Sequence, residues 1–401
     1  MSMSIREKFT GLGIDAAPGQ EVQRNDATSN EEKIPGTPVD FSHGDVDAFL
    51  PTPGSFEAFE AAVQEGGSQA YTEYRGRSDI REDLAVKLSA FTGKKVSPNE
   101  VILTPGTQGA LFLAMGACVA HGDKVAIVEP DYFANRKLVV FLEGVLLPVP
   151  LNYLGNTNRA GIDLDALEKA FKDGARVFLF SSPNNPTGVI YSKEELGEIG
   201  KLARHHGVTV LADELYARQI FDGRPYNHLC AMQEAPEEIV TVIGPSKTES
   251  LSGYRLGVAF GNSAIIDRME KLQAIVSLRC SGYAQAVFRC WFNEPDNWLA
   301  DRVRQHQAIR DDLVQLLRSV NGVDVRQPEG GSYLFVCFPK MKIQMKEYVH
   351  LLRTVAGVTV THGTEFGPGF EDWFRINFSQ NHTAAVDALK RAITLMERYR
   401  V

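Results

Sequence analysis

The sequence predicts an α/β protein whose mostly parallel sheet is flanked by helices and joined to a second, smaller α+β domain. Three observations support this. Short β-branched and aliphatic runs alternate with helical stretches between residues 101 and 243, as in a parallel sheet covered on both faces. Polar residues follow directly after several of these runs. After about residue 285 the pattern changes to helices mixed with short strands. We therefore expect an N-terminal arm with part of the small domain at 1–45, a large domain at 46–285 and a small domain at 286–401.

The elements ahead of the sheet are an arm and two helices. Residues 1 to about 40 are polar and rich in Gly and Pro, which predicts an extended arm. Residues 55–65 place Phe56, Phe59 and Ala62 at helical spacing. A second helix is expected from residue 78 to about 91.

The central elements alternate. Strands are predicted at residues 101–103, 125–128, 177–180, 208–211 and 240–243, with helices such as 193–206 between them. The C-terminal part predicts helices at 298–320, 345–356 and 383–398, and strands at 323–325, 332–338, 358–361 and 373–378.

Composition excludes several classes of protein. The net charge of −8 without a basic run argues against a nucleic-acid partner. No apolar stretch approaches the roughly 20 residues of a membrane span, and no apolar signal core begins the chain, so we expect a cytoplasmic protein. The five cysteines lack paired spacing, which favours reduced thiols and no metal site.

The segment 244–257 contains a lysine just past a β-rich run. Lys247 is flanked by Ser246 and Thr248, and Arg255 follows eight positions later. Burial favours the neutral amine of a lysine, which can attack a carbonyl to form a Schiff base. Ser246 and Arg255 would suit a phosphate. Together they suggest an aldehyde cofactor with a phosphate, such as pyridoxal 5'-phosphate (PLP); a surface lysine is the alternative.

Other polar residues stand where predicted strands end. Thr107 and Gln108, Tyr132, Asn185, and Asp213 with Tyr216 each follow a different strand. Each has a simpler explanation as a turn or a helix cap. Because ligands of parallel sheets bind beyond the carboxyl ends of strands, their convergence predicts one site.

These motifs resemble the class I/II PLP-dependent aminotransferases, which have the aspartate-aminotransferase-like fold type I. The resemblance runs from about residue 40 to the C-terminus. It includes Ser-Pro-Asn-Asn-Pro-Thr-Gly at 182–188, Asp-Glu-Leu-Tyr at 213–216, Ser-Lys at 246–247 with Arg-Leu-Gly at 255–257, and Phe-Arg-Ile-Asn-Phe at 374–378.

The resemblance implies a catalytic set of Lys247, Asp213 and Tyr216 in a PLP-binding large domain. Lys247 would carry the internal aldimine and move the proton between the substrate Cα and the cofactor. Asp213 would keep the pyridine nitrogen protonated. Asn185 and Tyr216 would bond the phenolic oxygen, and Tyr132 would stack on the ring.

The same resemblance implies a phosphate site at a helix N-terminus. Gly106, Thr107 and Gln108 would offer donors there, where the helix dipole favours an anion. Ser246 and Arg255 would complete the phosphate site.

Substrate residues and a partner subunit are also implied. Arg375 would bind the substrate α-carboxylate, with Asn185 beside it and Gly44 allowing a close backbone approach. Tyr71 would reach the phosphate of the neighbouring subunit, which implies a homodimer. Arg279 lies near the position of a side-chain-binding arginine in dicarboxylate-specific members, although a structural arginine is equally expected.

Two departures from the family pattern concern the lysine segment. Gly244 stands where the family often has a serine, which puts one phosphate contact in doubt. Glu249 is expected at the surface, or as a device for a cationic substrate. His43, Asp45, Glu73, Tyr74 and Arg75 are further candidates for the pocket wall.

Three functions remain open. The leading one is an aminotransferase that moves an amino group from an L-amino acid to a 2-oxo acid in a ping-pong cycle. The alternative is elimination or replacement, cyclisation or oxidation of an amino acid, including a basic one such as arginine, since the cofactor residues are shared. A non-catalytic sensor on this fold is disfavoured by the intact Lys247, Asp213 and Arg375.

Overall fold

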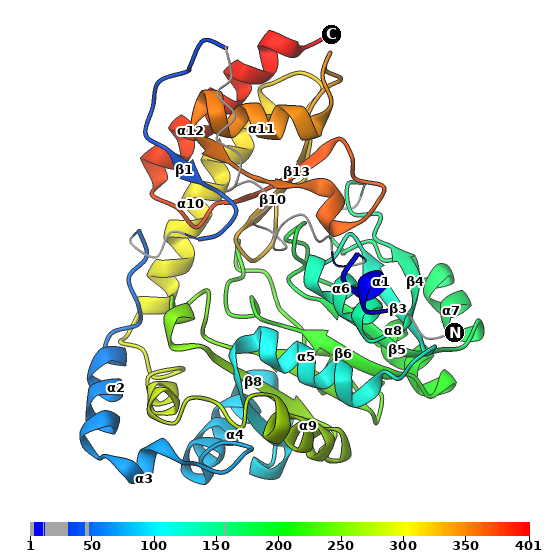
Figure 1. Ribbon diagram of the computed structural model, residues 1–401, viewed down its shortest axis with the longest axis vertical. Coiled ribbons are helices and arrows are strands. Elements are labelled where there is room, and N and C mark those ends of the chain that lie inside the picture. Colours follow the sequence, from blue (N-terminus) through cyan, green and yellow to red (C-terminus); the bar gives the residue numbers. More distant parts are fainter. Residues whose placement is uncertain (1–3, 11, 13–30, 45–47, 156–157) are drawn as a thin grey trace.

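The large part of the molecule is built around a seven-stranded sheet (Figure 1). The computed structural model describes residues 4–10, 12, 31–44, 48–155 and 158–401. The strand order is β2-β8-β7-β6-β5-β3-β4, and only β8 runs antiparallel to its neighbours. The prediction of a mostly parallel sheet is confirmed. Its strands are β2 (Val101–Pro105), β3 (Lys124–Glu129), β4 (Val145–Pro150), β5 (Ala175–Ser181), β6 (Thr209–Asp213), β7 (Ile239–Ile243) and β8 (Leu256–Gly261).

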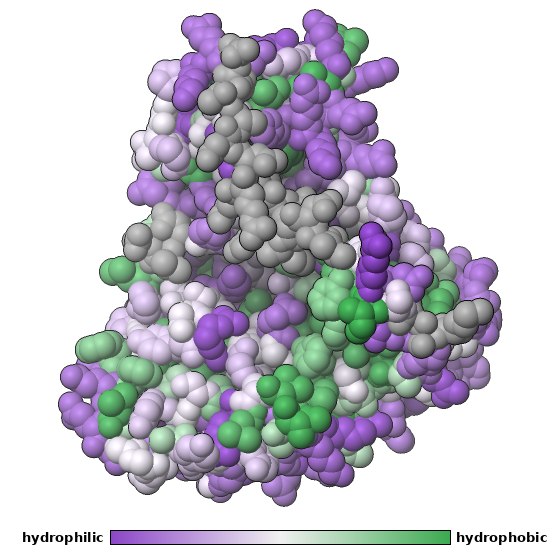
Figure 2. All heavy atoms as spheres, viewed as in Figure 1, coloured by the Kyte–Doolittle hydropathy of each residue, from purple (hydrophilic) through white to green (hydrophobic). Residues whose placement is uncertain are grey.

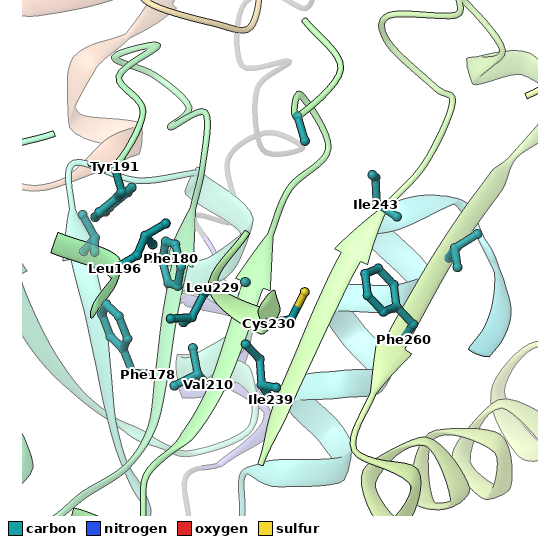
Figure 3. Close-up of a cluster of buried hydrophobic side chains, with 14 of the residues drawn as sticks. Phe178, Phe180, Tyr191, Leu196, Val210, Leu229, Cys230, Ile239, Ile243 and Phe260 are labelled. Carbon is teal, nitrogen blue, oxygen red and sulfur yellow. The ribbon is translucent and has the colours of Figure 1, made fainter. Parts of the chain in front are cut away.

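Both faces of this sheet are buried. Along β5, Phe178 and Phe180 point into one hydrophobic cluster (Figure 3), while Val177 and Leu179 belong to another. The first cluster includes side chains of α4, α7 and α8, and the second those of α5, α6 and α9. This two-sided cover explains why the strand sequences are almost continuously apolar. The helices around the sheet are α2 (Ser55–Gln64), α3 (Gly67–Ala70), α4 (Ser78–Thr92), α5 (Gly106–Cys118), α6 (Phe133–Phe141), α7 (Leu164–Lys172), α8 (Lys193–His206) and α9 (Ser263–Val276).

The smaller part has its own core. A four-stranded antiparallel sheet in the order β12-β13-β10-β9 packs with the last three helices. Near the N-terminus, β1 pairs with β11, and Val39 and Phe41 join this core. The domain boundaries after residues 45 and 285 stay a prediction. The elements are β1 (Val39–Asp40), α10 (Trp298–Arg318), β9 (Asp324–Val325), β10 (Tyr333–Cys337), α11 (Met345–Ala356), β11 (Val358–Thr359), β12 (Thr361–His362), β13 (Trp373–Asn377) and α12 (His382–Tyr399).

Two strands of the large sheet were not expected from the sequence. β4 contains Pro148 and Pro150, and it occupies the edge of the sheet, where proline is tolerated. β8 begins and ends near Gly257 and Gly261, so its apolar run is short. Part of the expected arm, namely residues 1–3, 11, 13–30 and 45, lies outside the described residues. Within the arm, the short helix α1 spans Ile5–Thr10. None of the helices in the described part of the chain has the length and apolar character needed to cross a bilayer.

Candidate active site

Two adjoining cavities lie beyond the carboxyl ends of β5, β6 and β7. The smaller has a volume of about 150 Å³ and the larger about 750 Å³. Tyr216, Ser246, Lys247 and Ser252 line both. Most of the residues singled out in the sequence line the smaller cavity: Thr107, Gln108, Tyr132, Asn185, Asp213, Tyr216, Ser246, Lys247 and Arg255. The convergence at one sheet edge is therefore a feature of the structure.

A half-buried amine and a buried carboxyl share this cavity. Lys247 lies in the loop after β7 and is half-buried. Asp213 is the last residue of β6 and is buried. Burial raises the pKa of the Asp213 carboxyl to about 7, although the Leu215 amide donates a hydrogen bond that opposes this. A cationic ligand group placed against Asp213 would favour its ionised form and gain a strong partner.

An anion cradle forms where α5 begins. Gly106 starts the helix with φ of +75°, and a Cβ there would lie 2.5 Å from Nη2 of Arg255. Only glycine lets that guanidinium come so close to the helix N-terminus. Arg255 is held by a hydrogen bond from Nη1 to the Ser252 carbonyl (3.0 Å). Helix N-terminus and guanidinium together suit a phosphate.

Two further contacts fix side chains around the cavity. The Tyr132 hydroxyl donates to Oε1 of Gln108 at 3.1 Å, which holds the tyrosine ring beside the start of α5. Ser246 donates to the Leu256 carbonyl at 3.3 Å. The ring of Tyr132 is thereby available as an apolar wall for a planar ligand.

Arg375 is a buried cation with a hydrogen-bond donor that has no partner. It lies on β13, donates from Nη1 to Oδ1 of Asn185 (2.9 Å) and from Nη2 to the Ser42 carbonyl (2.9 Å). Its Nε has no hydrogen-bond partner, and no carboxylate among the described residues pairs with it. A buried guanidinium without an anion is costly, so this geometry suits a carboxylate ligand. Gly44 lines the larger cavity; a Cβ there would lie 3.3 Å from the Ser379 Cβ.

Tyr71 and Arg279 line neither cavity. Tyr71 is 77% exposed, and the Arg279 guanidinium lies 4.5 Å from its ring centroid and 5.2 Å from that of Tyr74. Arg279 also donates to the Thr72 carbonyl at 2.7 Å. These side chains therefore form a surface cluster outside the chain's own site.

The expectation for Glu249 was wrong. The side chain is buried rather than at the surface, and Arg218 pairs with it at 2.6 Å. Arg218 also binds Glu294 at 2.7 Å. Because its charge is compensated inside the protein, Glu249 is not available to a cationic substrate. Of the other candidate wall residues, His43 lines the larger cavity, Arg75 pairs with Glu270, and Asp45 lies outside the described residues.

Two residues in or beside the smaller cavity were not predicted from the sequence. Tyr333 on β10 lines the smaller cavity, and its hydroxyl lies 2.7 Å from that of Tyr216. Asp131 is buried and accepts hydrogen bonds from the Ser181 hydroxyl and the Tyr132 amide. Burial raises the pKa of Asp131 to about 8. Asp131 follows a predicted strand, and this position could have identified it. Tyr333 lies inside a strand, where the sequence pattern gives no sign of a site residue.

Residues 38–393 match the family described as aminotransferase class I and II. The chain belongs to this family. The aminotransferase is 30% identical to the putative aminotransferase YugH of Bacillus subtilis, with 84% of this chain and 85% of that protein covered. It is 27% identical to an aspartate aminotransferase of Pyrococcus horikoshii, with 85% of this chain and 86% of that protein covered.

Solved structures agree with the family. A crystal structure of an aspartate aminotransferase from Rhodobacter sphaeroides is 58% identical, has a TM-score of 0.94, and covers 99% of this chain and 100% of its own. The aminotransferase therefore has fold type I and is a transferase that catalyses transamination. Families of this class are generally PLP-dependent and act on amino acids and 2-oxo acids.

Proposed function

We propose that this aminotransferase binds PLP at Lys247 and takes aspartate as its amino donor, passing the amino group to a 2-oxo acid in a ping-pong cycle. The observation that carries the proposal is one cavity lined by Lys247, Asp213 and Arg255 together. The Lys247 amine matches the aldehyde of PLP, the buried Asp213 carboxyl matches its pyridine nitrogen, and the anion site at Arg255 matches its phosphate. When bound, PLP supplies an electron sink for the substrate Cα.

The side chains around the cavity fit the cofactor at each functional group. Gly106, Thr107, Gln108, Ser246 and Arg255 are the proposed phosphate ligands. The space that a Cβ on Gly106 would fill supports this, because it lets backbone and guanidinium approach one anion.

The remaining residues would position the ring and move the proton. Asp213 would hold the pyridine nitrogen protonated, and Asn185 and Tyr216 would bond the phenolic oxygen. Tyr132 would stack on the ring. The Lys247 amine would take the proton from the substrate Cα and deliver it to the cofactor.

The proposal of aspartate rests on a buried cation for the α-carboxylate, on the lack of a free acidic group at Glu249 and on the name of a similar protein. Arg375 would bind the α-carboxylate, which its unpartnered Nε supports. His43 lines the larger cavity, and its hydrogen bond to Asp40 raises the pKa of the imidazole to about 9; because Asp40 lines the same cavity, the pair adds no net charge there. Glu249 is buried and paired with Arg218, which removes support for a basic substrate. The name of the 58% identical protein also supports aspartate.

A homodimer in the cytoplasm completes the proposal. Ile275, Val276 and Leu278 are exposed close in sequence to Arg279, and apolar side chains gather over α9 in Figure 2. An exposed apolar patch of this kind supports a protein interface. Tyr71 and Arg279 would then reach the partner's site. The five cysteines are all free, as expected in a reducing compartment.

The test is the visible spectrum of the PLP-loaded protein, mixed anaerobically with aspartate, arginine, phenylalanine or alanine. Aspartate should convert the cofactor to its amine form fastest, and a 2-oxo acid should reverse the change. A spectrum that returns without a 2-oxo acid would point to elimination, cyclisation or oxidation and overturn the proposal.

Two variants sharpen this test. Lys247→Ala should lose the absorbance of the covalently held cofactor together with turnover. Arg375→Ala should raise KM for every amino acid tested, because each carries an α-carboxylate. An effect of Arg375→Ala confined to aspartate would instead assign the arginine to the substrate side chain.

A further inference from the structure

Tyr333 lines the smaller cavity and contacts a second tyrosine of that cavity. Its hydroxyl lies 2.7 Å from the hydroxyl of Tyr216, and both side chains are buried. The two rings meet edge to face, with centroids 5.4 Å apart. Tyr216 comes from the loop after β6 of the large sheet and Tyr333 from β10 of the small sheet. One hydrogen bond at the cavity thus joins the two parts of the molecule.

We propose that Tyr333 is a positioning residue for Tyr216: its hydroxyl donates to the Tyr216 oxygen and so strengthens the bond that Tyr216 makes to the phenolic oxygen of PLP. This inference rests on the proposed function and adds a residue to the same site. A tyrosine hydroxyl has one proton. If Tyr216 gives its proton to the cofactor oxygen, it must accept one from Tyr333.

The surroundings of Tyr333 favour that direction of donation. The Arg375 guanidinium lies 4.3 Å from the Tyr333 ring centroid. Burial alone would raise the pKa of Tyr333, but the positive charge of Arg375, that of Lys247 while its amine is free, and the bond with Tyr216 bring it below its usual value. Burial and the neighbouring Tyr333 hold the pKa of Tyr216 well above its usual value. The guanidinium over the Tyr333 ring favours the more acidic hydroxyl at Tyr333, and the more acidic hydroxyl is the better donor. The titratable and charged side chains facing the pair are Asp213, Lys247, Arg375 and Tyr132.

A chain of two hydrogen bonds is stronger than its parts. Each bond polarises the next, by about 10–30% in condensed-phase estimates. The chain runs from Tyr333 to Tyr216 and on to the cofactor oxygen. It stabilises negative charge on that oxygen, so it should lower the pH at which the bound cofactor's visible absorbance titrates.

The experiment is a spectral pH titration of the PLP-loaded protein. Tyr333→Phe should raise the spectral pKa of the bound cofactor by about 0.3–0.5 pH units, from the polarisation and a charge-assisted bond of ordinary strength. Tyr216→Phe should raise it further. In the Tyr216→Phe background, Tyr333→Phe should cause no further change in the spectral pKa, because the Tyr216 hydroxyl that links Tyr333 to the cofactor is absent.

Tyr348→Phe is the matched control. Tyr348 is also a buried tyrosine of the smaller part, and its hydroxyl donates to the Ala392 carbonyl at 2.7 Å, away from the cavities. The Tyr348→Phe variant should be less stable than the unsubstituted protein but should have the same spectral pKa.

The outcomes are distinct. An unchanged spectral pKa in Tyr333→Phe overturns the inference, as does an equal shift in both backgrounds, since Tyr333 would then act without Tyr216. Absence of any PLP absorbance in the unsubstituted protein would instead overturn the proposed function, and that result appears before any tyrosine is changed.

Discussion

Thr107, which lines the smaller cavity, leaves no room for a side chain at Gly244: a Cβ on Gly244 would lie 2.9 Å from Cγ2 of Thr107 and 3.2 Å from the Leu256 carbonyl oxygen. The threonine methyl occupies the space that a side chain at position 244 would need. This crowding accounts for the glycine at position 244, where the resemblance to the family led us to expect a serine. The two positions are therefore coupled through one methyl group.

Gly244→Ser should weaken PLP binding. The new side chain would press on Thr107 and displace the start of α5, and overpacking of this kind costs about 1–3 kcal/mol. We expect the Kd for PLP, measured by equilibrium dialysis, to rise about tenfold, which corresponds to about 1.4 kcal/mol.

Thr107→Ser tests the mechanism of that loss. It removes the methyl and keeps the hydroxyl, so the double variant Gly244→Ser with Thr107→Ser should bind PLP better than Gly244→Ser alone. Gly253→Ser is the control, because a Cβ at Gly253 meets no atom within 4 Å. Equal losses in the single and double variants would show that the methyl is not the obstacle.

The buried cluster of Arg218, Glu249 and Glu294 should be important for stability. The three side chains are no more than 7% exposed, and the guanidinium also lies 4.2 Å from the Phe292 ring centroid. Arg218→Ala would leave two carboxylates buried without their cation. Breaking a buried pair in this way costs about 3–5 kcal/mol of unfolding free energy.

Urea unfolding should separate this cluster from a surface pair. Arg289 pairs with Asp79 at 2.9 Å, and both side chains are about half exposed. Arg289→Ala should cost only about 0–1 kcal/mol, as exposed pairs do. Similar losses in the two variants would contradict the importance of the buried cluster.

His306 should make stability depend on pH on the acid side. It is buried, stacks on Phe49 with centroids 4.0 Å apart, and contacts the Ser379 hydroxyl at 2.9 Å. Burial lowers its pKa from 6.5 to about 4. Between these values the unfolded chain binds a proton that the folded protein does not. The contribution of His306 is therefore present above pH 6.5 and is lost as the pH falls toward 4.

His306→Gln should flatten this dependence. The slope of unfolding free energy between pH 6.5 and 4.5 should be smaller in the variant than in the unsubstituted protein by up to about 1.4 kcal/mol per pH unit. His205→Gln, at an exposed position, is the control and should leave the slope unchanged. Identical slopes for His306→Gln and the unsubstituted protein would show that this histidine does not titrate across folding.

Much of the site could be predicted because it follows from strand positions. Asp213 and Lys247 come at or just after the ends of neighbouring strands β6 and β7. The pairing of parallel strands brings their carboxyl ends to one edge, so local sequence already implied their proximity. The edge strand β4 was missed since its prolines break the usual strand pattern.

The sequence by itself determined the fold class, the family and most of the polar residues around the smaller cavity, because alternation of apolar runs and strand-end motifs are local properties of the chain. The tertiary structure decided what distant residues do to one another. It buried Glu249 against Arg218, and it brought Tyr333 to Tyr216 across 117 positions. Such contacts join different segments of the chain, and no spacing within one segment encodes that.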